Sequence, residues 1–285
     1  MDTDETVLSE DLLDRVVERL GLARRPDPDL DGLAAVYAAW AREVPFDNLR
    51  KLIHLANGDP SPLPGGDAGD FFTAWLSWGT GGTCWAANGA LCVLLRSLGF
   101  DARRGVGTMM VAPDLPPNHG TVVATIDDRR YLVDASILFA APLPLDPERE
   151  TTVDHPAWGV RCAQRDARWH VRWRPLHIPD GLDCRIDALQ ASAAEFAEYH
   201  ERTRGWSPFN FEANARRNRG ASVVGIAFGA RVAIDDRGEV SRAPLTPEER
   251  RRVLVEEVGI APELVDRVPM DRKTPPPPTS HTARR

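Results

Sequence analysis

Lysine is nearly absent from this chain, whose basic residues are otherwise arginines. Only Lys51 and Lys273 occur among 35 basic residues, which face 42 acidic ones, so the formal net charge is −7. A protein that binds nucleic acid through its general surface needs a basic patch. The charge balance therefore argues against nucleic acid as a partner. We attribute the scarcity of lysine to a GC-rich genome rather than to function.

Cysteine is scarce as well. The chain of 285 residues has four cysteines, too few for a disulfide scaffold: Cys84, Cys92, Cys162 and Cys184. Cys84 and Cys92 are eight residues apart, so they lack the short paired spacing of a zinc site. We therefore expect reduced thiols and no bound metal, and we ask whether one thiol is reactive.

Long apolar runs and nucleotide-binding loops are missing too. No stretch reaches the ~18 apolar residues of a membrane span. The start, MDTDETVLSEDLL, is acidic, whereas a secretory signal begins basic and then turns apolar. Neither GxGxxG after a strand nor GxxxxGK[ST] occurs, which excludes the common dinucleotide and P-loop sites. We expect a cytoplasmic protein with no membrane partner.

What is present changes character at Gly99. Before it, residues 10–22, 30–44 and 86–98 have helical apolar spacing. After it come short runs rich in β-branched residues, and TIDDRRYLVD is typical of a hairpin. Helices followed by antiparallel-type strands indicate an α+β fold rather than alternating βαβ units.

The last third mixes both patterns. We expect a helix over residues 187–205 and three short strands within ASVVGIAFGARVAIDDRGEVSRAPL. TPEERRRVLVEEVGI has a capping-box arrangement at Thr246 and Glu249 and predicts a closing helix. The tail from about Asp271, with its run of four prolines, is expected to be disordered.

Cys84 lies where a glycine-rich stretch meets a helix-like run, in GTGGTCWAANGALCVLLRSLGF. A helix N-terminus favours a thiolate through its partial positive charge and free N–H groups. The same N–H groups suit an oxyanion on an attacked carbonyl. The position therefore suits a nucleophile, and a small buried hydrophobe is the alternative that stays open. Cys92, within LCVLL, is assigned to the core.

His119 and Asp134 are the candidates for a base and its orienting group. His119 begins the strand-like run HGTVVATID, and Asp134 follows fifteen residues later in the apolar YLVDAS. A buried aspartate is costly unless it is hydrogen-bonded, and the Nδ1–H of a histidine is a suitable donor. If 121–127 and 130–136 pair as a hairpin, both side chains lie near its open end. Together with Cys84 they form a nucleophile, base and orienter.

The remaining polar candidates are weaker. Asn88 lies one helical turn after Cys84 and either hydrogen-bonds at the site or holds the adjoining loop. We do not expect catalysis from the other histidines, which are His54, His155, His170, His177, His200 and His281.

These motifs resemble those of the arylamine N-acetyltransferase family. VPFDNL (44–49), GGTCWAANG (81–89), NHGTVV (118–123) and YLVDAS (131–136) are similar to the family's IPFENL, RGGxCxExN, strand-initial histidine and YLVDVGFG-like segment. Cys84, His119 and Asp134 keep the order of the family's Cys–His–Asp triad. WSPFNFEAN and the closing LTPEERRRVLVEEVGI resemble its third segment, so the resemblance spans about residues 12–260.

The resemblance implies a fold and its division. It implies a papain- or transglutaminase-like catalytic core in an α+β protein with an N-terminal helical bundle, a central antiparallel β-barrel and a C-terminal α/β lid. The helical domain would cover residues 1–98, the barrel 99–205, the lid 206–270 and the tail 271–285.

The resemblance also implies a ping-pong reaction. Cys84 would take an acyl group from a thioester such as acetyl-CoA, a co-substrate rather than a permanent cofactor. His119 would accept the thiol proton, Asp134 would hold the imidazole, and an aromatic amine or hydrazine would receive the acyl group. Phe46, Trp85 and Asn88 are the candidate substrate contacts, the first two as walls of an apolar cleft. No coenzyme-binding residue is assigned.

The chain departs from the family pattern near the site. Thr80 replaces the arginine before Gly-Gly, Ala86 replaces the glutamate, and Ser136 replaces the first glycine of a loop that here reads ASILFAAPLP. A backbone without glycine approaches phosphate less closely. Three alternatives therefore stay open: an amide synthase fed by an acyl carrier protein, a cysteine hydrolase or transglutaminase-like enzyme, and an inactive binding protein.

Overall fold

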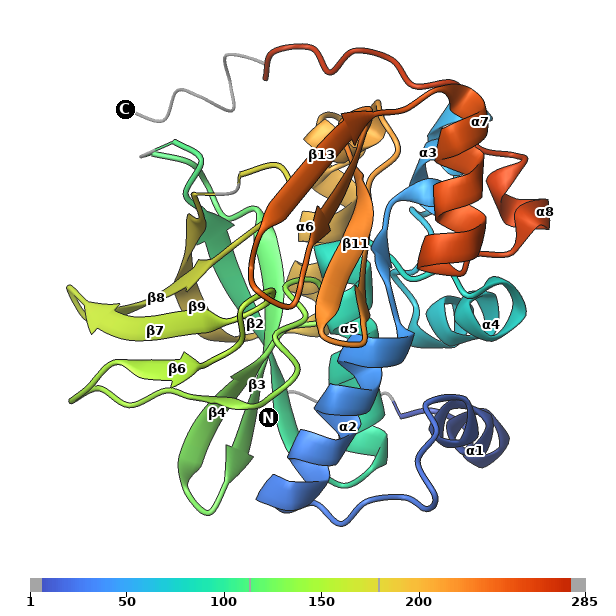
Figure 1. Ribbon diagram of the computed structural model, residues 1–285. Coiled ribbons are helices and arrows are strands. Elements are labelled where there is room, and N and C mark those ends of the chain that lie inside the picture. Colours follow the sequence, from blue (N-terminus) through green and yellow to red (C-terminus); the bar gives the residue numbers. More distant parts are fainter. Residues whose placement is uncertain (1–6, 113, 179, 278–285) are drawn as a thin grey trace.

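The N-terminal part of the chain is helical, as the sequence predicts (Figure 1). The computed structural model describes residues 7–112, 114–178 and 180–277. Its first helices are α1 (Glu10–Arg19), α2 (Leu30–Glu43), α3 (Leu49–Ala56), α4 (Ala68–Trp78) and α5 (Cys84–Ser97). The helix α4 was not expected from the sequence. Its apolar residues Phe71, Phe72 and Trp75 are buried; the first two pack against Trp40 of α2, and Trp75 packs against Phe72.

The middle of the chain forms an antiparallel sheet that curls into a nearly closed barrel (Figure 1). Its strands lie in the order β5-β4-β3-β2-β9-β8-β7-β6. They are β2 (Asp101–Met109), β3 (His119–Ile126), β4 (Arg129–Val133), β5 (Leu143–Pro144), β6 (Thr151–Val153), β7 (Val160–Arg165), β8 (Arg168–Trp173) and β9 (Leu182–Ala191). At the seam, the Thr151 hydroxyl donates to the Pro144 carbonyl oxygen at 2.6 Å.

The expected hairpin of β3 and β4 is confirmed. Val122 pairs with Val133 and Ile126 with Arg129, so Asp127 and Asp128 alone form the turn. Both have positive φ, 48° and 62°, as a two-residue hairpin turn of this hand requires. The hairpin therefore brings the start of β3 beside the end of β4.

The expected helix over residues 187–205 was wrong at its first part. Residues up to Ala191 belong to β9, which pairs with both β2 and β8, and the helix α6 spans Ala193–Arg202. Ser192 and Glu195 form a capping box that starts α6. The alanine-rich run misled the helical interpretation because pairing with β2, through Ala188 and Ala191, overrides a weak local preference.

The lid is a second antiparallel sheet, with the order β1-β10-β11-β12-β13. The strands are β1 (Phe46–Asp47), β10 (Ala215–Arg219), β11 (Ser222–Ala227), β12 (Ala230–Ile234) and β13 (Val240–Pro244). A 3-10 turn, η1 (Pro208–Asn210), precedes β10. After β13 come the helix α7 (Pro247–Arg252), the π-helical segment η2 (Val253–Val258) and the helix α8 (Pro262–Val265). The expected Thr246–Glu249 capping box starts α7.

The strand β1 ties the helical part to the lid, since Asp47 pairs with Ala215 of β10. The division of the chain at residues 98 and 205 stays a prediction. The tail expectation was wrong for residues 271–274: the Asp271 carboxylate accepts from the Ala213 N–H, and the Arg272 N–H donates to the Phe211 carbonyl. The end of the expected tail, residues 278–285, lies outside the described residues.

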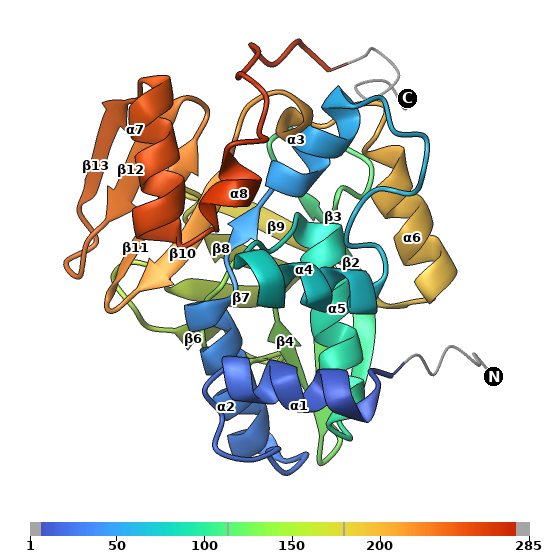
Figure 2. The ribbon, with the colours of Figure 1, turned by 90° about the vertical axis from the view of Figure 1, so that its right-hand side faces the viewer.

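The helix α5 lies in the middle of the molecule (Figure 2). It packs against β2 and β3 of the barrel on one side and against α4 and α6 on the others. Nearly all of its residues are buried, which explains its apolar sequence on every face. The α+β architecture that the sequence predicts is confirmed.

Candidate active site

Cys84 is the first residue of α5 and follows the N-cap residue Thr83. Its side chain is near the surface, with 9% of the residue exposed. A Cβ on Gly81 would lie 1.8 Å from the Pro45 carbonyl oxygen, so only glycine lets this loop press against the start of β1. The first N–H groups of a helix lack partners within it, and Cys84 is at this end of α5.

His119 and Asp134 meet at the open end of the hairpin. The His119 Nε2 lies 2.7 Å from Asp134 Oδ2, and both residues are buried. The Nδ1–H, which the sequence suggested as the donor to Asp134, is not the ring nitrogen in this contact. Because Nε2 is bonded to Asp134, Nδ1 is the nitrogen that remains for Cys84. The thiol itself lies 3.9 Å from the Asn118 carbonyl oxygen, next to His119.

Charge stabilises the protonated imidazole. Burial lowers the pKa of His119, but the charge and hydrogen bond of Asp134, followed by those of Cys84, raise it well above its ordinary value. Burial raises the pKa of Asp134, yet His119 and the N–H groups of Ile137 and Ser136 lower it overall. The arrangement therefore favours a protonated His119 beside the carboxylate of Asp134.

Asn88 holds this arrangement together. It is completely buried. Its Nδ2 donates to the carbonyl oxygens of Cys84 (3.1 Å) and Gly120 (2.6 Å) and to Asp134 Oδ1 (3.3 Å). Its Oδ1 accepts from the Ala135 N–H at 2.8 Å. We assign Asn88 to positioning, because the side chain has no open surface for a substrate.

Sequence reasoning missed two further partners of Asp134. The Ser136 hydroxyl donates to Asp134 Oδ1 at 2.8 Å, so this residue at the place of a family glycine supports the carboxylate. A serine two residues after an aspartate was an available signal for such a turn. The Tyr37 hydroxyl donates to the Asp134 carbonyl oxygen at 2.8 Å from α2, and nothing in the sequence linked these distant residues.

The two aromatic candidates lie in different surroundings. Phe46 is half-buried and packs edge-to-face against Phe209, at 5.3 Å between ring centroids. Trp85 is buried between Phe196 and Tyr199 of α6, with centroid distances of 4.9 and 5.0 Å. Trp85 therefore joins α5 to α6, whereas Phe46 begins an aromatic row that continues through Phe209 to Phe228.

Thr80 and Ala86 have their own packing roles. The Thr80 hydroxyl lies 3.0 Å from each carboxylate oxygen of the buried Asp47. Burial raises the pKa of Asp47 although the N–H groups of Leu49 and Gly81, and then Thr80, oppose the shift. Ala86 lies against Gly65, where a Cβ would come within 2.8 Å, so the loop before α4 covers the space of a larger side chain.

Other kinds of site are not found in the described part of the chain. No group of three or more His, Cys, Asp or Glu side chains among these residues is placed to hold a metal ion. No described helix combines the length and apolar character needed to cross a membrane.

Comparisons with known proteins show what the chain is similar to. A family model described as N-acetyltransferase matches residues 29–174. An arylamine N-acetyltransferase of Mycolicibacterium smegmatis is 37% identical over 173 residues, a match that spans 56% of this chain and 61% of that relative. The curated relative is thus matched over less than two thirds of its length.

Solved structures share the fold over more of the chain. The arylamine N-acetyltransferase of Mycobacterium abscessus aligns with a TM-score of 0.76 at 19% identity, over 90% of this chain and 94% of that one. The Mycobacterium marinum enzyme, solved in complex with CoA, aligns with a TM-score of 0.75 at 18% identity, over 90% and 98%. On the family match over half of its length, supported by these relatives, the chain belongs to the arylamine N-acetyltransferase family.

Proposed function

We propose that this chain is an acyltransferase that moves an acyl group, acetyl in the first instance, from a thioester such as acetyl-CoA to the nitrogen of an arylamine or hydrazine. The observation that carries the proposal is the arrangement of Cys84 at the start of α5, with a buried His119–Asp134 pair beside it. The M. marinum relative binds CoA, which supports acetyl-CoA as the donor.

In the first half-reaction, the Cys84 sulfur attacks the thioester carbonyl. The thiol proton resides on His119, whose Nε2 stays bonded to Asp134. The oxyanion that forms on the carbonyl faces the first-turn N–H groups of α5. The tetrahedral intermediate collapses, the thiolate of the donor leaves, and it takes the proton from His119. Cys84 is then acylated.

In the second half-reaction, the amine attacks the acyl-cysteine. His119 accepts the proton that the nitrogen loses, and Cys84 leaves as the thiolate. Asp134 keeps the imidazole in one orientation through both steps, because four further hydrogen bonds hold its other oxygen, from Asn88, Ile137 and the N–H and hydroxyl of Ser136. The overall reaction exchanges a thioester for an amide.

The aromatic row supports an aromatic acceptor. Phe46 lies opposite Gly82 of the Cys84 loop, and its ring contacts Phe209. The row continues through Phe228 to His177, at 5.1 Å between centroids. Burial lowers the pKa of His177 to about 4, so its ring is uncharged at neutral pH. We infer that this row, rather than Trp85, forms the wall against which the amine lies.

A second donor class has a specific observation in its favour. The loop after Asp134 contains Leu138 and Ala140 with φ of 62° and 64°, a conformation that favours glycine. Leu138 is completely buried, so its side chain fills space that a glycine would leave open. A loop packed in this way favours a donor presented from outside, such as an acyl thioester on a carrier protein.

Intact-protein mass spectrometry after incubation with acetyl-CoA tests the proposal. We expect the mass of one acetyl group on the wild type and none on Cys84→Ala, and transfer to arylamines or hydrazines would follow. Selective alkylation of Cys84 without acetylation would instead support the carrier-protein donor. If Cys84 shows neither acetylation nor selective alkylation, its role as the nucleophile is contradicted. The protein would then be one that only binds a ligand.

A further inference from the structure

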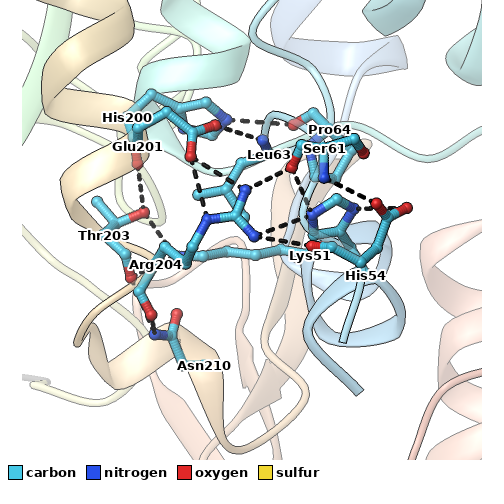
Figure 3. A network of polar contacts seen from close by, with 11 residues as sticks. Lys51, His54, Ser61, Leu63, Pro64, His200, Glu201, Thr203, Arg204 and Asn210 are labelled. Atoms are coloured by element: carbon cyan, nitrogen blue, oxygen red, sulfur yellow. Dashed lines mark hydrogen bonds and ion pairs between the residues drawn. The ribbon is translucent and has the colours of Figure 1, made fainter. Parts of the chain in front are cut away.

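One of the two lysines of the chain is buried beside the candidate nucleophile. Lys51, in α3, is only 4% exposed. Its Nζ donates to the Thr203 hydroxyl oxygen at 2.7 Å and lies 3.4 Å from the Thr203 carbonyl oxygen (Figure 3). Within the described ranges no carboxylate forms an ion pair with Lys51. A buried ammonium group held only by neutral oxygens is costly unless a negative charge lies close by.

A small polar cavity connects Lys51 to the loop before Cys84. Its volume is about 10 Å³, and Lys51, His200, Pro64, Gly82 and Thr83 are among its lining residues. His200 is buried, and its Nε2 lies 3.3 Å from the Pro64 carbonyl oxygen. Its Nδ1 has no hydrogen-bond partner among the described residues. Thr83 directly precedes Cys84, so Lys51 lies on the same cavity as the residues just before α5.

A negative charge on Cys84 would favour the ammonium form of Lys51. Burial lowers the pKa of Lys51 to about 7, while the negative charge of Cys84 and then that of Glu201 raise it, and Arg204 lowers it. Glu201 is already bonded to Arg204 and to the Leu63 N–H (Figure 3). An electrostatic interaction between two groups is mutual, so an ammonium group that a thiolate stabilises also stabilises the thiolate.

We propose that Lys51 is a positioning residue that stabilises the Cys84 thiolate across the Gly81–Thr83 loop, opposite to His119. The inference rests on the proposed role of Cys84 as the nucleophile. In the resting protein the thiolate then lies between two cations, one from the barrel and one from α3. Acylation removes the negative charge from the sulfur, so Lys51 loses a nearby anion in the first half-reaction and regains it in the second.

The alternative is a purely structural lysine. Thr203 is the C-cap residue of α6, and a cation there interacts favourably with the helix dipole. Under that alternative, Lys51 would respond to α6 and not to Cys84. The charged and titratable groups that face Lys51 are Cys84, Glu201 and Arg204, with Asp47, Arg50 and His200 on the same cavity.

The sparse lysine content allows a direct measurement. Protein labelled with ¹³C at the lysine ε-carbon contains two labelled residues, Lys51 and Lys273. We would titrate both signals in the wild type and in Cys84→Ala. Lys273 serves as the internal control, and we expect its midpoint near the ordinary value for lysine in both proteins.

We expect Lys51 to titrate well below Lys273 in the wild type. In Cys84→Ala its midpoint should fall by about one further pH unit, because the variant lacks the negative charge that favours the ammonium form. Alkylation of wild-type Cys84 with iodoacetamide, which gives a neutral adduct, should produce the same fall. A Lys51 midpoint that Cys84→Ala leaves unchanged would overturn the inference.

A second variant tests the reverse direction. In Lys51→Met, the pH–rate profile for alkylation of Cys84 should move to higher pH, with about tenfold slower alkylation on its acidic limb for each unit of displacement. Lys51→Arg should restore the profile, and Lys273→Met should leave it at the wild-type position. If wild-type Cys84 shows no selective alkylation, the proposed function fails. If it does, and Lys51→Met has the same profile, only the role of Lys51 fails.

Discussion

Asn88 offers the sharpest test of how the site is held together. The change is Asn88→Ala, which shortens a completely buried side chain inside α5 without altering charge. It removes the donor to the Cys84 and Gly120 carbonyl oxygens and the acceptor for the Ala135 N–H, at distances of 3.1, 2.6 and 2.8 Å. Three elements, α5, β3 and the loop after β4, thereby lose their common hydrogen-bonding partner.

The magnitude follows from these bonds. Each buried hydrogen bond contributes about 1 kcal/mol, and a buried N–H left without a partner costs about 1–3 kcal/mol. Two bonds to carbonyl oxygens, at about 1 kcal/mol each, and one abandoned donor at Ala135, at about 1–3 kcal/mol, give a loss of about 4 kcal/mol in the free energy of unfolding. The long contact to Asp134 Oδ1, at 3.3 Å, adds little, because that oxygen keeps other donors.

Urea unfolding of Asn88→Ala beside the wild type measures this loss, and the rate of acylation of Cys84 is the functional readout. If Asn88 positions the triad, stability and the acylation rate fall together while KM for the amine changes little. If Asn88 instead bound substrate, KM would rise with stability nearly unchanged. A loss below about 1 kcal/mol would refute the reasoning, because the bonds would then have been replaced or unimportant.

Three further predictions concern charge, strain and packing. The pKa of His119 is raised to about 10 in the folded protein, above its unfolded value of about 6.5. The stability that this shift contributes is therefore complete below about pH 6.5 and is lost as the pH rises toward 10. Urea unfolding should show this loss in the wild type and not in Asp134→Asn. Ala140→Gly should stabilise the protein by about 0.5 kcal/mol, because φ at this residue is 64°. The matched control Ala38→Gly, inside α2, should destabilise it by about 1 kcal/mol. Stability changes of the same sign for both variants in thermal unfolding would contradict the strain argument. Trp85→Ala should cost about 3–5 kcal/mol of stability, as a core residue does, and a change in KM alone would return Trp85 to the substrate wall.

Local patterns in the sequence predicted most of the helices and the β3–β4 hairpin. The predictions were right where the local sequence alone decides the structure. The apolar period of residues 10–22 predicted α1, and the paired aspartates predicted the turn at Asp127 and Asp128. They failed where a partner distant in sequence decides. Residues 187–191 became part of β9 because Ala188 and Ala191 pair with β2, and β10 was missed because its arginine-rich sequence ARRNR lacks the apolar alternation of a strand.

The sequence by itself pointed to the residues that we propose carry the chemistry. A cysteine after Gly-Gly at a helix start, a histidine at a strand start and an aspartate fifteen residues later were sufficient to propose Cys84, His119 and Asp134, because each depends on its own local context. Their family resemblance also predicted the α+β architecture. The turn at Asp127 and Asp128 brings His119 and Asp134, which are fifteen residues apart in the sequence, to a distance of 2.7 Å between Nε2 and Oδ2.

Only the tertiary structure decided the surroundings of those residues. Three features depend on side chains brought together from separate elements. Nε2 of His119 is the nitrogen beside Asp134, Asn88 and Tyr37 hold the same aspartate, and Lys51 lies buried near the start of α5. In the sequence, Lys51 was only a rare residue on a helix. Its burial is what matters, because an ammonium group affects a nearby thiolate strongly when water is excluded from both, and that exclusion is a property of the packed fold.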